Sequence, residues 1–355
     1  MSKAGASPLP VLLQACRPQP ASALPATLAA YLAQQQGEAG WDALQNLALR
    51  HGVLPLLYHG LKQAGVAMPE QFQAANQRVT LRNLRLGAEL HRVVAHLQAA
   101  GLPCLTLKGP AQSQLAYGNI ALRSGTDLDI ATPPEARSDV MQALAALGYV
   151  QDDPVQSVTA LEHLGQINLR HHTSGLLLDL HWRLNPLEGF FPLAVTSAIA
   201  ASRTVPVAGV AVPVLGDQHR LLYLAVHGAL HRWERLIWLC DLAWELHPDM
   251  PAQNDMAAIR RMAAETGAAR LLQLSLHLAA TELGAAVDAE ARRPLPPGLA
   301  LATAWMRHKL SVAPMAGEVP NIVRIATLLL FQDGWRRRWG ELCRMAGRAK
   351  ARLAG

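Results

Sequence analysis

The chain has 355 residues, 32 of them Lys or Arg and 26 Asp or Glu, which gives a formal net charge of +6 and a pI near 9.4. This modest positive excess suits a phosphate-bearing ligand but does not by itself indicate nucleic acid. Half of the residues are hydrophobic and only 5% are aromatic, a composition that favours helices. The length is sufficient for a large core and for two or three domains.

The cysteines and the apolar segments define the expected compartment. Four cysteines lie far apart, at positions 16, 104, 240 and 343, so neither a zinc knuckle nor a disulfide framework is predicted. Prolines at positions 8, 10, 18 and 20 interrupt any apolar run long enough for a signal sequence. Every other long apolar segment contains His, Arg or Asp before the roughly 20 residues that span a bilayer. We expect a soluble, cytoplasmic protein without a transmembrane segment.

Residues 1–100 are predicted to form an N-terminal helical region that acts as a scaffold. Trp41 to Ala64 has apolar residues three and four apart, with a break at Gly52 and Pro55. Glu70 to Ala100 is a second, longer helix candidate.

Residues 101–215 mix strand and helix signals and are predicted to form an α+β core with a small mixed sheet. The expected strands are Pro103–Leu107, Thr126–Ala131, Val158–Arg170 and Gly175–Leu184, followed by a hairpin over Thr204–Leu215. The expected helices are Pro110–Tyr117 and a segment from Pro133 through Leu147, which Gly148 ends.

Residues 216–355 are predicted to form a C-terminal helical domain. One helix is expected over Gln218–Leu246, and alanine- and leucine-rich helices follow Pro251. A loop over Arg292–Gly298 interrupts them. The chain ends in an Arg- and Trp-rich stretch from Trp335 to Arg352, which is typical of an amphipathic solvated helix, although contact with RNA or a membrane surface is an alternative.

Two carboxylates alternate with apolar residues in the strand Thr126–Ala131. Successive strand residues point to opposite faces, so Asp127 and Asp129 share one face while Leu128 and Ile130 face the core. Their charges repel unless a cation lies between them, and Mg²⁺ with oxygen ligands supplies one. A third carboxylate completes a two-metal site, and Asp179, between leucines on a second apolar strand, is the candidate.

A Lys-Gly pair stands where the strand Pro103–Leu107 meets the following helix. Backbone amides at a helix start attract phosphate, and Gly109 allows close approach. Lys108 supplies a point charge. Arg123 either donates to phosphate or braces the carboxylates as an ion pair. Hydroxyls at positions 124 (Ser) and 126 (Thr) either donate to phosphate or cap the loop.

These motifs together resemble a known superfamily. A strand followed by Lys-Gly, then Arg-x-x-x-Asp-x-Asp from Arg123 to Asp129, then Asp179 alone on a strand is similar to the polymerase-beta-type nucleotidyltransferases. The segments Leu147-Gly148-Tyr149 and Leu178–Trp182 resemble, more closely, an uncharacterised bacterial nucleotidyltransferase family. The resemblance implies a nucleotidyltransferase core. Pro110 follows Gly109 where the superfamily usually has Gly-Gly or Gly-Ser.

His227 and His231 have the i, i+4 spacing of zinc ligands, but Gly228 stands where a zinc-protease helix has its glutamate. Ordinary helix packing is the leading interpretation. The resemblance implies a second one, in which this helix face closes over the nucleotide or acceptor. His181 and Trp182 are expected in the core, and Asp241 is expected to be partly buried and paired.

The predicted function is Mg²⁺-dependent transfer of a nucleoside monophosphate from an NTP, with ATP the expected nucleotide, to an unidentified acceptor hydroxyl. Asp127 and Asp129 would hold two Mg²⁺ ions, and Asp179 would bind one of them and act as the base. The acceptor is a small molecule, a glycan, a peptide or RNA. The alternatives are a toxin-type tRNA nucleotidyltransferase, γ-phosphoryl transfer on the same platform, or a non-catalytic nucleotide-binding scaffold.

Overall fold

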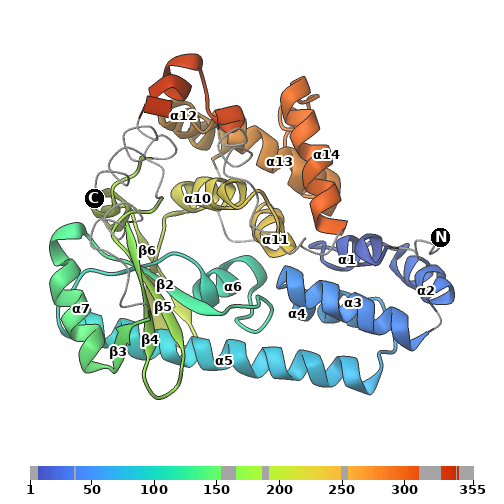
Figure 1. The fold of residues 1–355 in the computed structure, drawn as a ribbon, viewed down its shortest axis with the longest axis horizontal. Helices are drawn as coiled ribbons and strands as arrows, with labels where there is room; N and C mark the ends of the chain where they lie inside the picture. Colours follow the sequence, from blue (N-terminus) through green and yellow to red (C-terminus); the bar gives the residue numbers. More distant parts are fainter. Residues whose placement is uncertain are drawn as a thin grey trace.

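The fold was analysed in a computed structural model (Figure 1) that describes residues 7–35, 37–152, 165–185, 192–248, 255–311, 329–340 and 342–343. Its α-helices are α1 Leu9–Ala15, α2 Leu24–Gln34, α3 Glu38–His51, α4 Leu54–Gln63, α5 Glu70–Ala99, α6 Gly109–Tyr117, α7 Arg137–Ala146, α9 Val195–Ala200, α10 Asp217–Leu230, α11 Leu236–Glu245, α12 Met256–Thr266, α13 Ala269–Leu283 and α14 Pro297–Ser311. A short 3₁₀ helix, η1, spans Pro134–Ala136. Its strands are β1 Leu105–Thr106, β2 Asp127–Ala131, β3 Tyr149–Gln151, β4 Gln166–His171, β5 Leu177–His181, β6 Arg203–Val207 and β7 Val210–Val214.

The strands form a seven-stranded mixed sheet in the order β3-β4-β5-β2-β1-β7-β6. β2 pairs in parallel with β5, and β1 pairs in parallel with β7. The other neighbouring strands are antiparallel. The sheet and its helices confirm the predicted α+β class. The expected hairpins join β4 to β5 and β6 to β7, while residues 158–164 of the expected strand lie outside the described part of the chain.

Several element boundaries follow from local sequence signals. Gly52 adopts a left-handed conformation with φ +69° and separates α3 from α4, as the predicted break requires. Pro110 stands in the first turn of α6, where proline fits because that amide has no helical acceptor. α5 spans Glu70–Ala99, in agreement with the long predicted helix.

The single helix predicted over Gln218–Leu246 is wrong. α10 ends at Leu230 and α11 begins at Leu236, because Arg232 and Trp233 between them have φ of 54° and 46°. Burial of the Trp233 side chain, which is 1% exposed, ends the first helix. The periodic pattern continued across the break because both helices pack on the same core.

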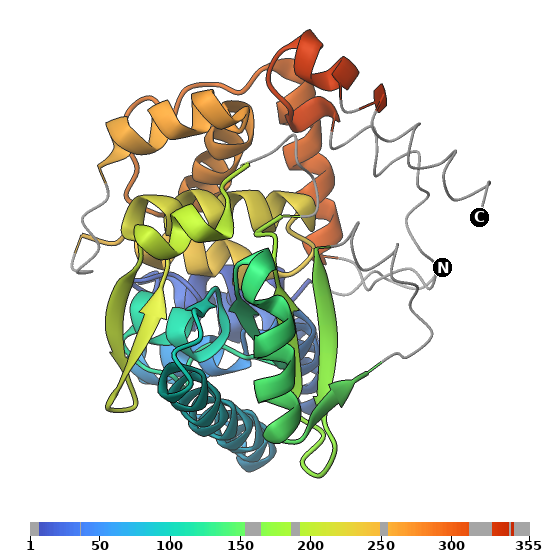
Figure 2. The same ribbon diagram turned by 90° about the vertical axis from the view of Figure 1, so that its left-hand side faces the viewer.

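The buried apolar residues form two clusters. One lies between the sheet and the C-terminal half of α5, and it contains Leu90, Leu128, Ile130 and Leu180. The second unites the N-terminal helices with α10, α11 and α13, so segments from opposite ends of the chain share one core. In both ribbon views α10 lies above the strands, and α5 crosses the lower part of the picture, level with the lower ends of the strands (Figure 1 and Figure 2). The seven strands lie between residues 105 and 214, and the three-part division of the chain stays a prediction.

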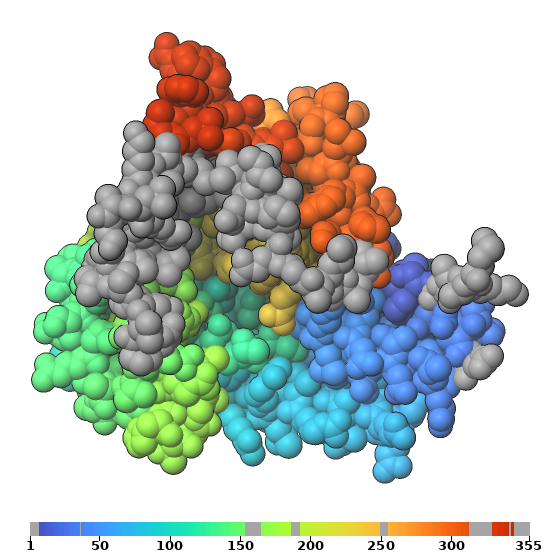
Figure 3. Space-filling model, viewed as in Figure 1, coloured from blue at the N-terminus to red at the C-terminus, as the bar shows by residue number. Residues whose placement is uncertain are grey.

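No helix in the described part of the chain combines the length and the apolar character that crossing a bilayer requires. On the face shown in Figure 3, the surface is hollowed between the sheet and the C-terminal helices. Segments coloured as α6 and α10–α11 are visible at the bottom of this hollow (Figure 3).

Gly60→Ala should destabilise the fold, because α4 crosses α1 at this glycine. A Cβ at Gly60 would lie 2.1 Å from the carbonyl oxygen of Ala15, a backbone atom that cannot rotate away. Such overpacking costs about 1–3 kcal/mol, measurable by urea unfolding. Gly87→Ala in α5 is the matched control, because its Cβ meets only the end of the Ile120 side chain, and its higher helix propensity favours it. A Gly60→Ala protein as stable as wild type would contradict this helix crossing.

Candidate active site

The sheet register brings the three predicted carboxylates onto two adjacent strands. β2 and β5 pair with Asp129 opposite Asp179, and with Asp127 opposite Leu177. Leu128 and Leu178 point to the opposite face and are 1% and 0% exposed. Their burial in the core fixes which face of the sheet carries the carboxylates. Asp179 therefore lies beside the strand that carries Asp127 and Asp129, because the two strands are neighbours in the sheet.

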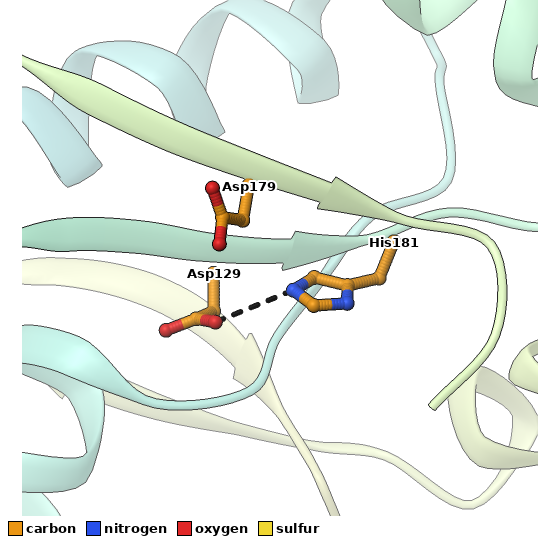
Figure 4. A group of neighbouring side chains, drawn as sticks. All are labelled: Asp129, Asp179 and His181. Atoms are coloured by element: carbon orange, nitrogen blue, oxygen red, sulfur yellow. Dashed lines mark hydrogen bonds and ion pairs between the residues drawn. The ribbon is translucent and has the colours of Figure 1, made fainter. Parts of the chain in front are cut away.

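Asp129, Asp179 and His181 converge above these strands (Figure 4). One ligand atom from each lies within 4.8 Å of the others, so the three fit a single metal ion. Two carboxylates suit Mg²⁺, and the imidazole adds a nitrogen donor that transition metals such as Mn²⁺ or Zn²⁺ accept more readily. Asp127 is outside this group. Its carboxylate accepts a hydrogen bond of 3.2 Å from the Thr126 hydroxyl.

His181 was expected to be a core residue that shares a strand face with Asp179, and the structure places it beside Asp129 and Asp179. It is 7% exposed, and its Nε2 lies 3.3 Å from Asp129 Oδ1. The signal was its spacing of two from Asp179, which puts both side chains on one strand face.

Lys108 contacts the same oxygen of Asp129 as His181 does. Its Nζ lies 2.8 Å from Asp129 Oδ1, and it stands just before α6, at the corner where Gly109 has φ +67°. The amide of Leu107 also donates to the Asp129 carbonyl at 3.0 Å, which holds this corner against β2. The predicted phosphate contact of Lys108 stays a prediction, because its ammonium pairs with Asp129 here.

Burial and neighbouring charges shift the pKa of the three carboxyl groups in different directions. Burial alone raises the pKa of Asp129, but Lys108 and His181 outweigh it and hold that pKa far below the usual range. Burial, followed by the charge of Asp129, raises the pKa of Asp127. Burial and the charges of Asp129 and Asp127 raise the pKa of Asp179 to about 6. Asp129 is therefore a fixed anion, whereas Asp179 exchanges its proton near neutral pH.

Asn168 is a site residue that sequence reasoning missed. It lies opposite Asp179 in the β4–β5 pair, and its Nδ2 donates to Asp179 Oδ1 at 2.5 Å. The amide fixes one carboxylate oxygen and leaves the other free. Asn168 alternates with buried Ile167 and Leu169, which shows that its side chain lies on the opposite face of the strand. The pattern identifies Asn168 as a neighbour of Asp179 only once the strand register is known.

Arg123 is occupied by an ion pair with a distant helix. Its Nε lies 2.9 Å from Asp241 Oδ2 on α11, and Asp241 Oδ1 also accepts a hydrogen bond of 2.8 Å from the Tyr117 hydroxyl. Burial lowers the pKa of Arg123, but Asp241 and Tyr117 outweigh it, so the guanidinium stays charged. Arg123 was expected either to bind phosphate or to form an ion pair with the carboxylates of the site. It forms an ion pair, but with Asp241 of α11. Ser124 follows it in the loop to β2, half-buried.

Four rings from α10 and α11 form an aromatic row beside the site. His227 lies 6.0 Å from Tyr223 and 4.6 Å from His231 between ring centroids, and Trp238 lies 4.8 Å from His231. Burial and then the charge of Lys108 lower the pKa of His227, so its imidazole is neutral and close to the acidic group. Within the described residues, the metal-binding group of three does not include His227 or His231. Their nucleotide contact stays a prediction.

Asp241→Asn should destabilise the protein by about 3–5 kcal/mol, because Arg123 would remain buried without its counterion. Asp241 and Arg123 are 1% and 8% exposed. Asp288→Asn is the control, since Asp288 is paired with Arg260 but its side chain is 41% exposed, and a surface pair contributes only about 0–1 kcal/mol. Urea unfolding of both variants tests this. Equal losses of unfolding free energy in the two variants would show that the buried Arg123–Asp241 pair stabilises the fold no more than the surface pair does.

In metal-free buffer, Asp179→Asn should stabilise the fold above about pH 6 and have little effect near pH 4. The raised pKa means that the folded state binds this proton more tightly, so the contribution of Asp179 to stability is greatest below the unfolded value of 3.8 and is lost as pH rises to about 6. The gain expected near pH 7.5 is about 1–3 kcal/mol. Asp139→Asn, exposed on α7, is the control. The same effect at both pH values would contradict the raised pKa.

Comparison with the curated proteins finds no match. A solved structure of an antigenic nucleotidyltransferase-like protein from Paracoccidioides brasiliensis has 13% identity, over 61% of this chain and 94% of that chain, with a TM-score of 0.30. The profile of the family described as uncharacterised nucleotidyltransferase matches residues 37–284, which include all seven strands. The chain belongs to this uncharacterised nucleotidyltransferase family.

Proposed function

We propose that the protein is a metal-dependent nucleotidyltransferase that moves a nucleoside monophosphate from an NTP, with ATP the expected nucleotide, to an acceptor hydroxyl. The observation that carries this proposal is the β2–β5 register. It places two carboxylates directly opposite each other, and a lysine contacts one of them. Opposed like charges destabilise a sheet unless cations balance them, so their presence supports a ligand-binding role.

The donor set fits divalent metal ions. Asp127, Asp129 and Asp179 would hold the two Mg²⁺ ions, and His181 is available as a further donor to the one between Asp129 and Asp179. When bound, such ions polarise phosphoryl oxygens and make the attacking hydroxyl more acidic. The chain itself contributes the fixed anion of Asp129 and the orientation that Asn168 imposes on Asp179.

In the proposed reaction the acceptor oxygen forms a bond to the α-phosphorus of the NTP. The bond from that phosphorus to the bridging oxygen breaks, and pyrophosphate leaves with the electron pair. The hydroxyl proton goes to the Asp179 carboxylate. In the metal-free protein, burial and the charges of Asp129 and Asp127 raise the pKa of this carboxyl to about 6, so it is ionised at neutral pH.

Lys108 and the backbone at Gly109 are proposed to hold phosphate oxygens, with the hydroxyls of Ser124 and Thr126 as additional donors. Lys108 already lies in the site through its 2.8 Å contact with Asp129, so its ammonium has only a short way to move. His227 and His231 are proposed to face the nucleotide. Aromatic rings in a row suit stacking against a base.

RNA is a second acceptor class with an observation in its favour. Arg78, Arg82 and Arg85 are exposed and are spaced along one side of α5. No ion pair occupies them within the part of the chain that the structure describes. Such a row can contact successive phosphates of a polynucleotide. RNase treatment of the labelled product separates RNA from the other acceptors.

Label transfer tests the proposed reaction. Wild-type protein with Mg²⁺, cell lysate and each α-³²P NTP should label one fraction of the lysate, and γ-³²P ATP should not. Asp127→Asn combined with Asp129→Asn should lower labelling at least about 100-fold, because the charge that stabilises the transition state is lost. Chelation of divalent ions should have the same effect.

Asp288→Asn is the control variant and should label normally, since Asp288 lies on the surface against Arg260. Labelling from γ-³²P ATP would favour γ-phosphoryl transfer instead. Full cellular function of the double variant would favour the non-catalytic scaffold.

A further inference from the structure

Three large apolar side chains near the C-terminus face solvent. Trp335, Trp339 and Leu342 are 72%, 64% and 37% exposed, whereas the other six tryptophans of the chain are buried or half-buried. Residues 335–340 and 342–343 are helical, and intervals of four and three residues are those of one helix face. We call these three residues the tryptophan row. An exposed apolar row bordered by polar residues is typical of an interaction surface.

The segment that carries the tryptophan row is attached to α12 and α13. The Asp333 carboxylate accepts hydrogen bonds from the amides of the first two residues of α13, at 2.7 and 3.0 Å. Nη2 of Arg337 donates to the carbonyl oxygen of Glu265 in α12 at 2.9 Å. In Figure 3 this segment, coloured red, projects at the upper end of the molecule. The protein therefore holds the row in place while leaving its apolar side chains in contact with water.

Positive charge is concentrated in the same part of the sequence. Residues 335–355 contain seven of the 32 basic residues and one of the 26 acidic residues, so they carry the whole formal net charge of +6. Arg336 is exposed, and its guanidinium lies 5.6 Å from the ring centroid of Trp335. Apolar side chains beside an excess of basic residues complement a bilayer whose lipid headgroups are anionic.

We propose that the tryptophan row docks on the surface of an anionic phospholipid bilayer. Indole rings are amphipathic and favour the boundary between headgroups and acyl chains, and Leu342 extends the apolar face that would enter this boundary. The basic residues would then lie against lipid phosphates. RNA fits these contacts less well, because leucine cannot stack on a base, and Arg337 and Arg338 both donate to main-chain carbonyl oxygens.

Sedimentation of the full chain with lipid vesicles tests the proposal. The protein should bind vesicles made of equal parts phosphatidylglycerol and phosphatidylcholine, and bind vesicles of phosphatidylcholine alone far more weakly. Trp335→Ser combined with Trp339→Ser should weaken binding to the anionic vesicles at least about 10-fold, because two rings leave the interface. Arg336→Gln should weaken it about 5-fold, because one cation near the anionic surface is lost.

Two variants of α5 are the matched controls. Leu81 is 56% exposed and Arg85 is exposed, so α5 presents the same residue types on a different helix. Leu81→Ser and Arg85→Gln should bind the anionic vesicles as wild type does. Urea unfolding of the double serine variant should match wild type, because the Trp335 and Trp339 side chains face solvent.

Quenching by brominated acyl chains locates the contact without relying on a loss of binding. Tryptophan emission of the wild type should fall when vesicles of phosphatidylglycerol and brominated phosphatidylcholine are added. Trp335→Phe combined with Trp339→Phe should still bind these vesicles but show much less quenching, because phenylalanine keeps the apolar contact and removes the two indoles at the interface.

The opposite results would overturn the proposal. Equal vesicle binding by the double serine variant and wild type, no binding of wild type to anionic vesicles, or a loss of binding in the α5 variants instead would each do so. Binding of a single-stranded oligoribonucleotide that requires both tryptophans, without vesicle binding, would make RNA the partner. Self-association that requires them, measured by light scattering, would make a second copy of the chain the partner.

Discussion

The parallel pairing of β2 with β5 is the constraint on which the acidic site depends. Side chains alternate along a strand, so a shift of one residue would turn Asp129 into the core and expose Leu128. The buried leucines thus fix the register that brings Asp129 and Asp179 together. Lys108 neutralises Asp129 and Asn168 donates a hydrogen bond to Asp179, but the remaining repulsion still raises the pKa of Asp179 to about 6.

A second set of buried polar contacts attaches α6 to α10 and α11. Asp241 and Glu245 lie one turn apart on α11, and both face α6: Asp241 accepts from Tyr117 at 2.8 Å, and Glu245 accepts from Gln112 at 3.0 Å. Arg220 of α10 closes the group through a bidentate pair with Glu245. The helix that follows the Lys108–Gly109 corner is thereby positioned against α10 and α11, which carry the aromatic row. Glu245 and Asp241 need these partners because each is almost fully buried.

Local patterns were sufficient for the strand faces but not for the ion pairs. Alternation in β2 and the apolar flanks of Asp179 predicted which side chains share a face, because strand geometry alone decides that. The Arg123–Asp241 pair joins residues 118 positions apart, and no local rule selects that partner over phosphate. The break between α10 and α11 was missed for a similar reason, since the periodic pattern is unchanged and only the burial of Trp233 in a tertiary pocket stops the helix. The pairing register of β4 and β2 with β5 brings Asn168 and His181 to the acidic residues, and a single sequence does not specify that register.

The distribution of charge explains why arginines of similar appearance have different roles. Arg123 and Arg220 are 8% and 2% exposed and meet carboxylates, because a buried guanidinium is tolerated only when it is paired. Arg78, Arg82 and Arg85 are exposed on α5 and take part in no ion pair among the described residues, because water can hydrate their charge. The two buried pairs therefore belong to the scaffold, and both hold α11 against the elements beside it.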